Sequence, residues 1–101
     1  MTQLIVFAGR AKEVRVLLDI VEEITQSGEK VVLLLIHEAC ELAVDQNLCE
    51  EVWRHDANLY VLAEDLETQG LLNRRVDGVR IADYDGWVKL LEDCEKVFSW
   101  T

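Results

Sequence analysis

The stretch that decides the fold is VVLLLI, residues 31–36 of the 101-residue chain. Every position in it is apolar, so an extended strand over these residues would carry apolar side chains on both of its faces. Branched side chains dominate the stretch, and Lys30 precedes it. This pattern is typical of a parallel strand that helices cover on both sides, and it predicts the central strand of the sheet.

Strand and helix patterns alternate on both sides of this stretch. Further strands are predicted over residues 4–8, 59–62, 79–82 and 97–100. Because right-handed crossovers join alternating strands and helices into a parallel sheet, the order predicts the α/β class. We expect one small domain over residues 1–101, in which a doubly wound, mainly parallel sheet of four to five strands forms three layers with its helices.

Apolar residues spaced three and four positions apart predict the helices. One helix runs over residues 14–24. A second, over residues 37–55, is broken at 45–47, where Asn47 and Glu50 resemble a capping box that restarts it. A short helix over residues 64–69 ends at Gly70, which can take the left-handed conformation. The last helix carries one apolar stripe, made of Trp87, Leu90, Leu91 and Cys94.

Composition excludes several classes of partner and site. Twenty acidic and ten basic residues give a formal net charge of -10, which would repel nucleic acid and anionic membranes. The longest apolar run has six residues, whereas a membrane-spanning helix needs about 20. No export signal is recognisable, so we expect a cytoplasmic protein. The three cysteines lack CxxC spacing, which predicts free thiols and no zinc site.

Ligand chemistry on such sheets gathers outside the carboxyl ends of the strands. The loops to consider are therefore residues 9–12, 37–40, 63–65 and 83–86. The first loop lacks the glycine-rich phosphate-binding motifs, so no nucleotide or flavin cofactor is expected. It also has Gly9 and Arg10 where a phosphoacceptor receiver domain would need carboxylates for magnesium.

Cys40 is the nucleophile candidate that its position favours. It follows the central strand at the predicted start of a helix, where free N–H groups and the helix dipole favour a thiolate. Glu38 and Glu41 oppose this by raising the thiol pKa, and cysteine is often buried simply as a small apolar group. Burial as a small apolar group is the favoured interpretation for Cys40. Cys49 and Cys94 are expected to fill the core or an interface.

Other polar and aromatic residues have structural explanations. His37 and Glu41 are four residues apart but provide too few ligands for a metal, so we expect a solvated pair. Asp65 and Asp85 are expected to cap their helices rather than to act as catalytic carboxylates. The remaining feature is the three tryptophans, which are many for so small a domain and suggest contact with a partner: Trp53, Trp87 and Trp100.

The last third of the chain carries a resemblance to a known family. The stretches are LYVLAEDLETQGL at residues 59–71, VRIADYDGWVKL at residues 79–90, and the terminal Ser99 and Trp100. They resemble the DsrH/TusB family of small sulfur-relay subunits, in the DsrE/DsrF/DsrH superfamily. The family pattern of a strand, an acidic residue, a glycine-ended helix, an Asp-Tyr pair and an aromatic residue falls on Asp65, Gly70, Asp83, Tyr84 and Trp87.

The resemblance implies a subunit of a complex that passes persulfide sulfur toward tRNA 2-thiouridine or in dissimilatory sulfur oxidation. Such subunits assemble with homologous DsrE/DsrF-like (TusD/TusC-like) chains, typically as a heterohexamer. In the sister subunits that carry sulfur, the active cysteine lies about where Leu62, Ala63 and Glu64 stand here, and none of these is a thiol. The chain is therefore expected to be a non-carrying structural and docking subunit.

This sequence departs from the family pattern at Gln69, where relatives tend to have arginine, and in a first helix without cysteine. Two alternatives stay open. Cys40 could accept sulfane sulfur as a persulfide and pass it on, which would make the chain a sulfurtransferase. The chain could also be a self-associating α/β module of unknown ligand.

Overall fold

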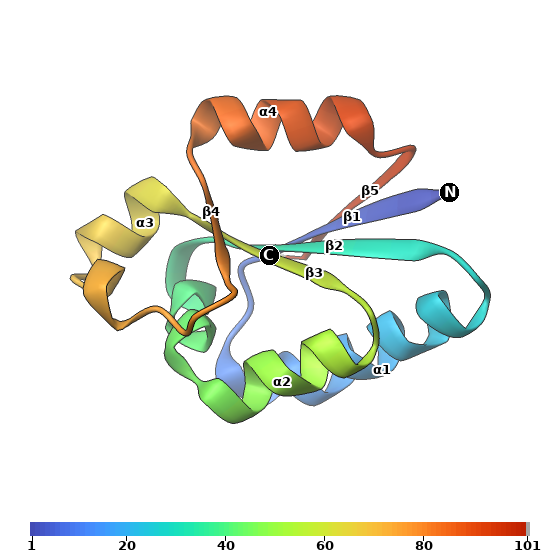
Figure 1. Cartoon of the computed structure of the whole chain (residues 1–101), viewed down its shortest axis with the longest axis horizontal. Coiled ribbons are helices and arrows are strands. Elements are labelled where there is room, and N and C mark those ends of the chain that lie inside the picture. Colours follow the sequence, from blue (N-terminus) through green and yellow to red (C-terminus); the bar gives the residue numbers. More distant parts are fainter. Residues whose placement is uncertain (101) are drawn as a thin grey trace.

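The sheet has five strands, all parallel, in a computed structural model that describes residues 1–100 and, of Ala11, only the backbone. The strands are β1 (Thr2–Phe7), β2 (Lys30–Leu35), β3 (Asn58–Leu62), β4 (Arg80–Ala82) and β5 (Lys96–Trp100). Their order across the sheet is β4-β3-β2-β1-β5 (Figure 1). The predicted central strand is confirmed, because β2 has two strands on either side of it.

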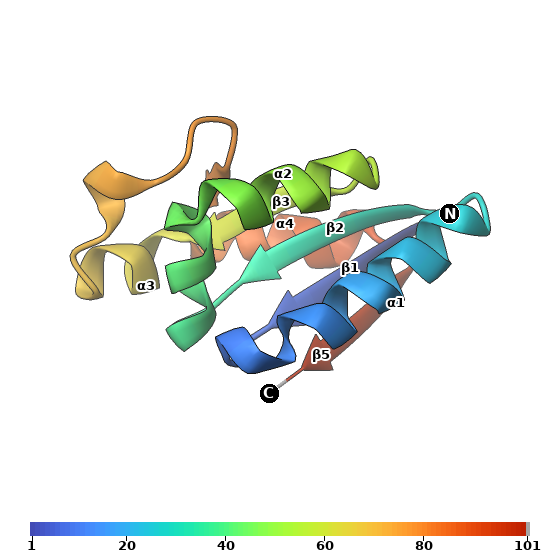
Figure 2. The same ribbon diagram turned by 90° about the horizontal axis from the view of Figure 1, so that it is seen from below.

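Helices cover both faces of this sheet. The α-helices are α1 (Val14–Gln26), α2 (Gln46–Arg54), α3 (Ala63–Thr68) and α4 (Tyr84–Asp93), and the 3-10 segments are η1 (Ala11–Glu13), η2 (His37–Val44) and η3 (Leu72–Arg74). Figure 1 shows α1 and α2 on one face and α4 on the other, so the three-layer α/β prediction is confirmed. Figure 2 shows α3 beyond the tips of the strands. Within residues 1–100, no helix is long and apolar enough to cross a bilayer.

The order of the strands follows from the handedness of the connections. β1, β2, β3 and β4 succeed one another in one direction across the sheet, and right-handed crossovers in that direction place α1 and α2 on the same face. The chain then returns over the opposite face through α4 to add β5 beside β1. Within residues 1–100, α4 is therefore the one helix that covers the second face.

Each face of the sheet has its own apolar core. The larger cluster lies under α1 and α2 and includes Phe7, Leu17, Leu33, Val61 and Leu66. The smaller cluster lies under α4, where Trp87, Leu90 and Cys94 pack on Leu4, Val6, Val32, Leu34, Ile36, Leu62 and Ala82. Leu91 is 41% exposed, so its predicted place in the inner stripe is wrong.

Two predicted helix caps are also wrong. The break near residue 45 is confirmed, but Asn47 lies inside α2 and Asp45 is the N-cap, accepting a hydrogen bond from the Leu48 N–H at 3.2 Å. Asp83 rather than Asp85 caps α4, accepting from the Gly86 N–H at 2.7 Å. In both helices the N-cap is the aspartate that directly follows the preceding element. Its carboxylate accepts a hydrogen bond from one N–H of the first turn.

Candidate functional site at the carboxyl edge of the sheet

The turn that follows β2 is held by side chains from α3 and from its C-cap residue. His37 lies two residues beyond the strand in a left-handed conformation, with φ of 52°. Its N–H donates to Asp65 Oδ2 at 2.7 Å, and its carbonyl accepts from Gln69 Nε2 at 2.6 Å. The imidazole Nδ1 also lies 3.5 Å from Asp65 Oδ2. Because β2 and β3 are neighbours, the residues that follow them meet at this edge.

Two predictions for these residues are corrected by this link. Asp65 does not cap its own helix, because the N-cap of α3 is Leu62 and the Asp65 carboxylate accepts from the chain after β2. His37 is paired with Asp65 rather than with Glu41. The left-handed conformation turns the chain of His37 toward α3, and this conformation is costly for a residue with a side chain.

Cys40 lies in η2 and is 0% exposed within the larger core. Its thiol contacts the Leu35 carbonyl, with Sγ 3.7 Å from the oxygen. Burial raises the pKa of Cys40 to about 12, and the negative charge of Asp65 adds to this. The sequence predicted that Glu38 and Glu41 would raise this pKa, whereas in the structure the carboxylate that raises it is Asp65. The thiol therefore stays protonated at neutral pH.

The other two thiols are also held in the protonated form. Cys49 lies in α2 and is buried in the larger core, and burial raises its pKa to about 11. Its Sγ lies 3.5 Å from the Leu42 carbonyl oxygen. Cys94 is partly exposed below α4, and burial first, then the charges of Glu95 and Asp93, raise its pKa. None of the three lies in surroundings that favour a thiolate.

The segment where β3 runs into α3 carries no thiol. Leu62 is 1% exposed and packs in the smaller core, while Ala63 and Glu64 are partly buried. Glu64 Oε1 is buried and has no hydrogen-bond partner among the described residues. This is the position where the resemblance would put the cysteine of a sulfur-carrying sister, and here it holds one apolar, one small and one acidic side chain.

The remaining motif residues have local structural roles. Gly70 has a φ of 69° and ends α3, with its N–H donating to the Glu67 carbonyl and the Leu71 N–H donating to the Leu66 carbonyl. Asp83 caps α4, and the Tyr84 ring stacks on the Trp87 ring with 6.3 Å between centroids. Each of these contacts fixes an end of a helix.

Trp100 fastens β5 to the loop after β1. Its indole Nε1 donates to Glu13 Oε2 at 2.9 Å, and Glu13 Oε1 accepts from the Arg10 N–H at 3.0 Å. Both hydrogen bonds lower the pKa of Glu13, the Arg10 amide most. The Trp100 ring also packs edge-on against Phe7 at 5.3 Å. Trp100 therefore stabilises the contact between β5 and the segment after β1, and it takes no part in the His37–Asp65 link.

The sequence matches the family described as DsrH like protein over residues 14–97. The chain belongs to the DsrH-like family. It is thus a member of a family of sulfur-relay subunits, which generally act in complexes with other such subunits. The family match includes α1 and α2 as well as residues 59–71 and 79–90, which carried most of the resemblance, and it ends before Ser99 and Trp100.

Solved structures share the fold of this DsrH-like chain. The ychN protein of E. coli has a TM-score of 0.69 at 12% identity, with 98% of this chain and 97% of that chain covered. A conserved protein of unknown function, BT1422 from Bacteroides thetaiotaomicron, has a TM-score of 0.67 at 13% identity, with 97% and 93% covered. At these identities the likeness concerns the fold alone. No curated protein matches the chain in sequence.

The DsrH-like chain therefore has a carboxyl edge that is built from hydrogen bonds rather than around a nucleophile. His37, Asp65 and Gln69 meet there, whereas Asp83, Tyr84, Trp87 and Trp100 lie in separate contacts. No group of three metal-ligating side chains occurs within residues 1–100. The link between His37 and Gln69 was missed from the sequence, and its signal was the adjacency of the two segments that follow neighbouring strands.

Proposed function

We propose that this DsrH-like chain is a non-carrying docking subunit of a cytoplasmic sulfur-relay complex. The complex would pass persulfide sulfur toward tRNA 2-thiouridine formation or in dissimilatory sulfur oxidation. Homologous DsrE/DsrF-like (TusD/TusC-like) subunits would be its partners and would carry the reactive cysteine. In this proposal the chain contributes a rigid surface, and no covalent step takes place on it.

The observation that carries the proposal is the state of the three thiols. Persulfide transfer requires a thiolate that can reach a donor. The Cys40 side chain is 0% exposed, and burial raises its pKa to about 12, so the thiol is neither ionised nor within reach of a donor at pH 7. Cys49 is equally buried, and the pKa of Cys94 is raised too. Residues 62–64, where the resemblance puts the active cysteine of sulfur-carrying subunits, contain no thiol that could act instead.

The persulfide-carrying alternative would need Cys40 to leave the core. A donor could reach its Sγ only if η2 separated from β2 and from α3, which would break the hydrogen bonds of His37 with Asp65 and Gln69. No contact of the described residues stabilises such an open form. The buried thiol is therefore explained by packing, where it fills space between β2 and η2.

The first experiment loads the purified chain with a persulfide donor and measures its intact mass. We expect no adduct, whereas a carrier would gain about 32 Da per sulfur atom. A homologous sister subunit that contains the active cysteine, loaded in the same way, is the positive control. A donor-dependent adduct on any cysteine of this chain would refute the proposal.

The second experiment asks whether the thiols matter in cells. A variant with Cys40→Ala, Cys49→Ala and Cys94→Ala should sustain sulfur relay as the parent chain does, measured as tRNA 2-thiouridine content or as sulfur oxidation. Its abundance must be compared with that of the parent, since two buried side chains and one partly buried side chain are truncated. A loss of relay at unchanged abundance would contradict the non-carrying role.

A further inference from the structure

Exposed apolar side chains gather on one side of the molecule. Ten large apolar residues are exposed among those described, and seven of them belong to α1, α4 or β5. We call these seven the β5 band: Val16, Ile20, Tyr84, Val88, Leu91, Val97 and Phe98. The three tryptophans, by contrast, are each partly buried. The apolar surface that was expected around tryptophan thus comes from other residues.

On the α1 face, the band borders a hollow between helix and strand. Val16, Ile20 and Ile24 are spaced four apart, so they form one stripe beside the buried face of α1. The hollow between this stripe and β5 has a volume of about 560 Å³, and Ile5, Phe98 and Trp100 contribute to its lining. Most of its lining is apolar, and no helix of the described chain fills it.

On the opposite face, the band continues along α4. Gly86, Lys89 and Asp93 line a hollow at the β4 edge of the sheet together with Tyr60 and Ile81. With about 3.6 residues per turn, Tyr84, Val88 and Leu91 lie on the other flank of the helix, which faces β1 and β5. The exposed residues of this flank are therefore on the same side of the molecule as β5.

The strand between these two flanks is an edge strand. β5 pairs with β1 alone, and Val97 and Phe98 are 42% and 52% exposed on its two faces. Proteins that keep an edge strand in water usually protect it with charged side chains, proline or a covering element. β5 has one charged residue, Lys96, and no proline. Its composition is that of a strand which another chain covers.

The charges beside the band determine which partner fits. Four exposed acids adjoin it at helical spacings of three or four residues: Asp19, Glu23, Asp85 and Glu92. None of them forms an ion pair within residues 1–100. A second copy would bring the same acids and a further charge of -10 against this surface. A surface with lysine or arginine at its border would instead pair with them.

We infer that the β5 band is the docking surface for a homologous subunit that presents an apolar patch bordered by basic side chains. The inference rests on the proposed docking function and assigns it a surface and a partner chemistry. Apolar contact on both flanks of β5 provides the affinity, and the four acids select a basic partner over a second copy. The band also lies away from the β4 edge, which gives the test an internal control.

The experiment measures assembly of this chain with homologous DsrE-like and DsrF-like subunits, purified separately and mixed at about 150 mM salt. Val97→Glu and Val88→Glu each place a charge in the band, and we expect about tenfold or greater weakening of the Kd. Ile81→Glu is the matched control, since Ile81 is 39% exposed on the opposite edge strand. Its Kd should stay within about twofold of the parent value. Circular dichroism verifies that each variant is folded.

A second arm tests the charges. Joint Asp19→Lys and Glu92→Lys substitution should weaken assembly and flatten the dependence of Kd on salt, because it removes acids that face basic groups. If the complex forms but the band variants bind as the parent does, the inference is wrong and the docking function stands. If the chain alone dimerises through the band, the partner chemistry is wrong. If no complex forms, both proposals fail.

Discussion

Replacing Asp65 tests whether the carboxyl edge is a structural device. The Asp65 carboxylate accepts the His37 N–H at 2.7 Å, and its side chain is only 19% exposed. Hydrogen bonds to charged groups contribute about 1.5–3 kcal/mol, so Asp65→Ala should lower the free energy of unfolding by about 2 kcal/mol. Asp65→Asn keeps an acceptor of the same shape and should lose less than half of that. Urea unfolding followed by tryptophan fluorescence measures both.

His37→Gly should change the free energy of unfolding in the opposite direction at the same site. A left-handed conformation costs about 1–2 kcal/mol for a residue with a side chain, and glycine avoids this cost. Since the imidazole is 67% exposed, its loss removes little packing. We expect His37→Gly to be neutral or stabilising by up to about 1 kcal/mol, after the extra chain entropy of glycine is deducted.

A change of less than about 0.5 kcal/mol in the free energy of unfolding of Asp65→Ala, the range of ordinary surface substitutions, would refute a structural role for the carboxylate. An asparagine variant as unstable as the alanine variant would also refute that role. Sulfur relay should continue with Asp65→Asn, because in the proposed docking role the carboxylate orders the turn after β2 and takes no part in chemistry. Loss of relay in a stable Asp65→Asn protein would indicate a chemical role instead.

Three further outcomes are expected. Iodoacetamide at pH 8 should alkylate Cys94 first and Cys40 only in denaturant, because burial raises the pKa of Cys40 to about 12; comparable native labelling of both would contradict this. Glu13 has a lowered pKa, so it adds stability above pH 4.5 that is lost as the pH falls through its folded pKa. Glu13→Gln should flatten this acid limb of the unfolding curve, and an unchanged limb would exclude the effect. Gly9→Ala should cost about 1–3 kcal/mol, since a Cβ would lie 2.6 Å from the buried Phe7 ring; a cost near zero in urea unfolding would mean that the ring moves freely.

Much of the fold could be predicted because it depends on local patterns. A short, fully apolar stretch rich in branched side chains, such as residues 31–36, favours a strand covered on both faces, and helix periodicity located α1 and α4 closely. Leu91 was misplaced because its spacing fits two adjacent stripes of α4, and only the position of the sheet below decides which one is buried. The caps at Asp45 and Asp83 were missed for a related reason, since several neighbouring polar residues could each serve.

The contacts at the carboxyl edge could not be derived in the same way. The link between His37 and Asp65 joins residues 28 positions apart, and it depends on the pairing of β2 with β3 and on the direction of η2. Local spacing suggested Glu41 as the partner of His37, because that pair is four residues apart. The burial of Cys40 was the easier inference, since a small apolar group next to the central strand fits a core irrespective of register.

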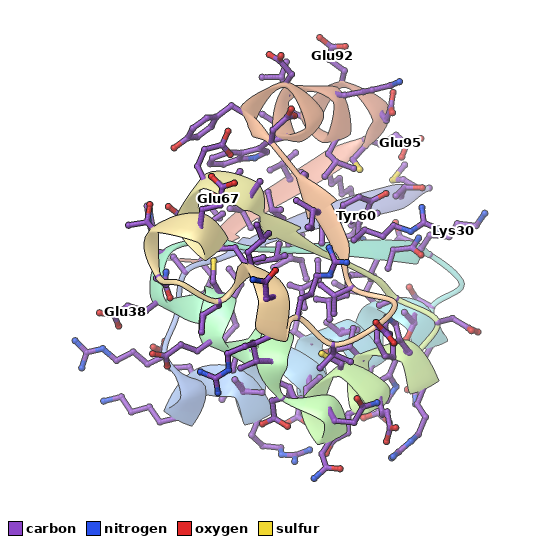
Figure 3. All side chains as sticks on the ribbon, turned by 60° about the vertical axis from the view of Figure 1, so that its left-hand side comes forward. Lys30, Glu38, Tyr60, Glu67, Glu92 and Glu95 are labelled. Carbon is purple, nitrogen blue, oxygen red and sulfur yellow. The ribbon has the colours of Figure 1, made fainter. Side chains whose placement is uncertain are left out.

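The β5 band follows from the topology of the chain rather than from any single residue. Crossovers from β1 toward β4 stack α1 and α2 on one face, and the single return through α4 leaves the outer side of β5 without a helix on either face. Figure 3 shows acidic side chains such as Glu92 and Glu95 projecting from the α4 side of the molecule. A chain that stayed alone in water could make the flanks of β5 polar at no cost to its two cores. This chain instead keeps Val16, Ile20, Val88 and Phe98 there, beside acids that have no ion-pair partner within residues 1–100, and that combination is explained by a basic, apolar partner.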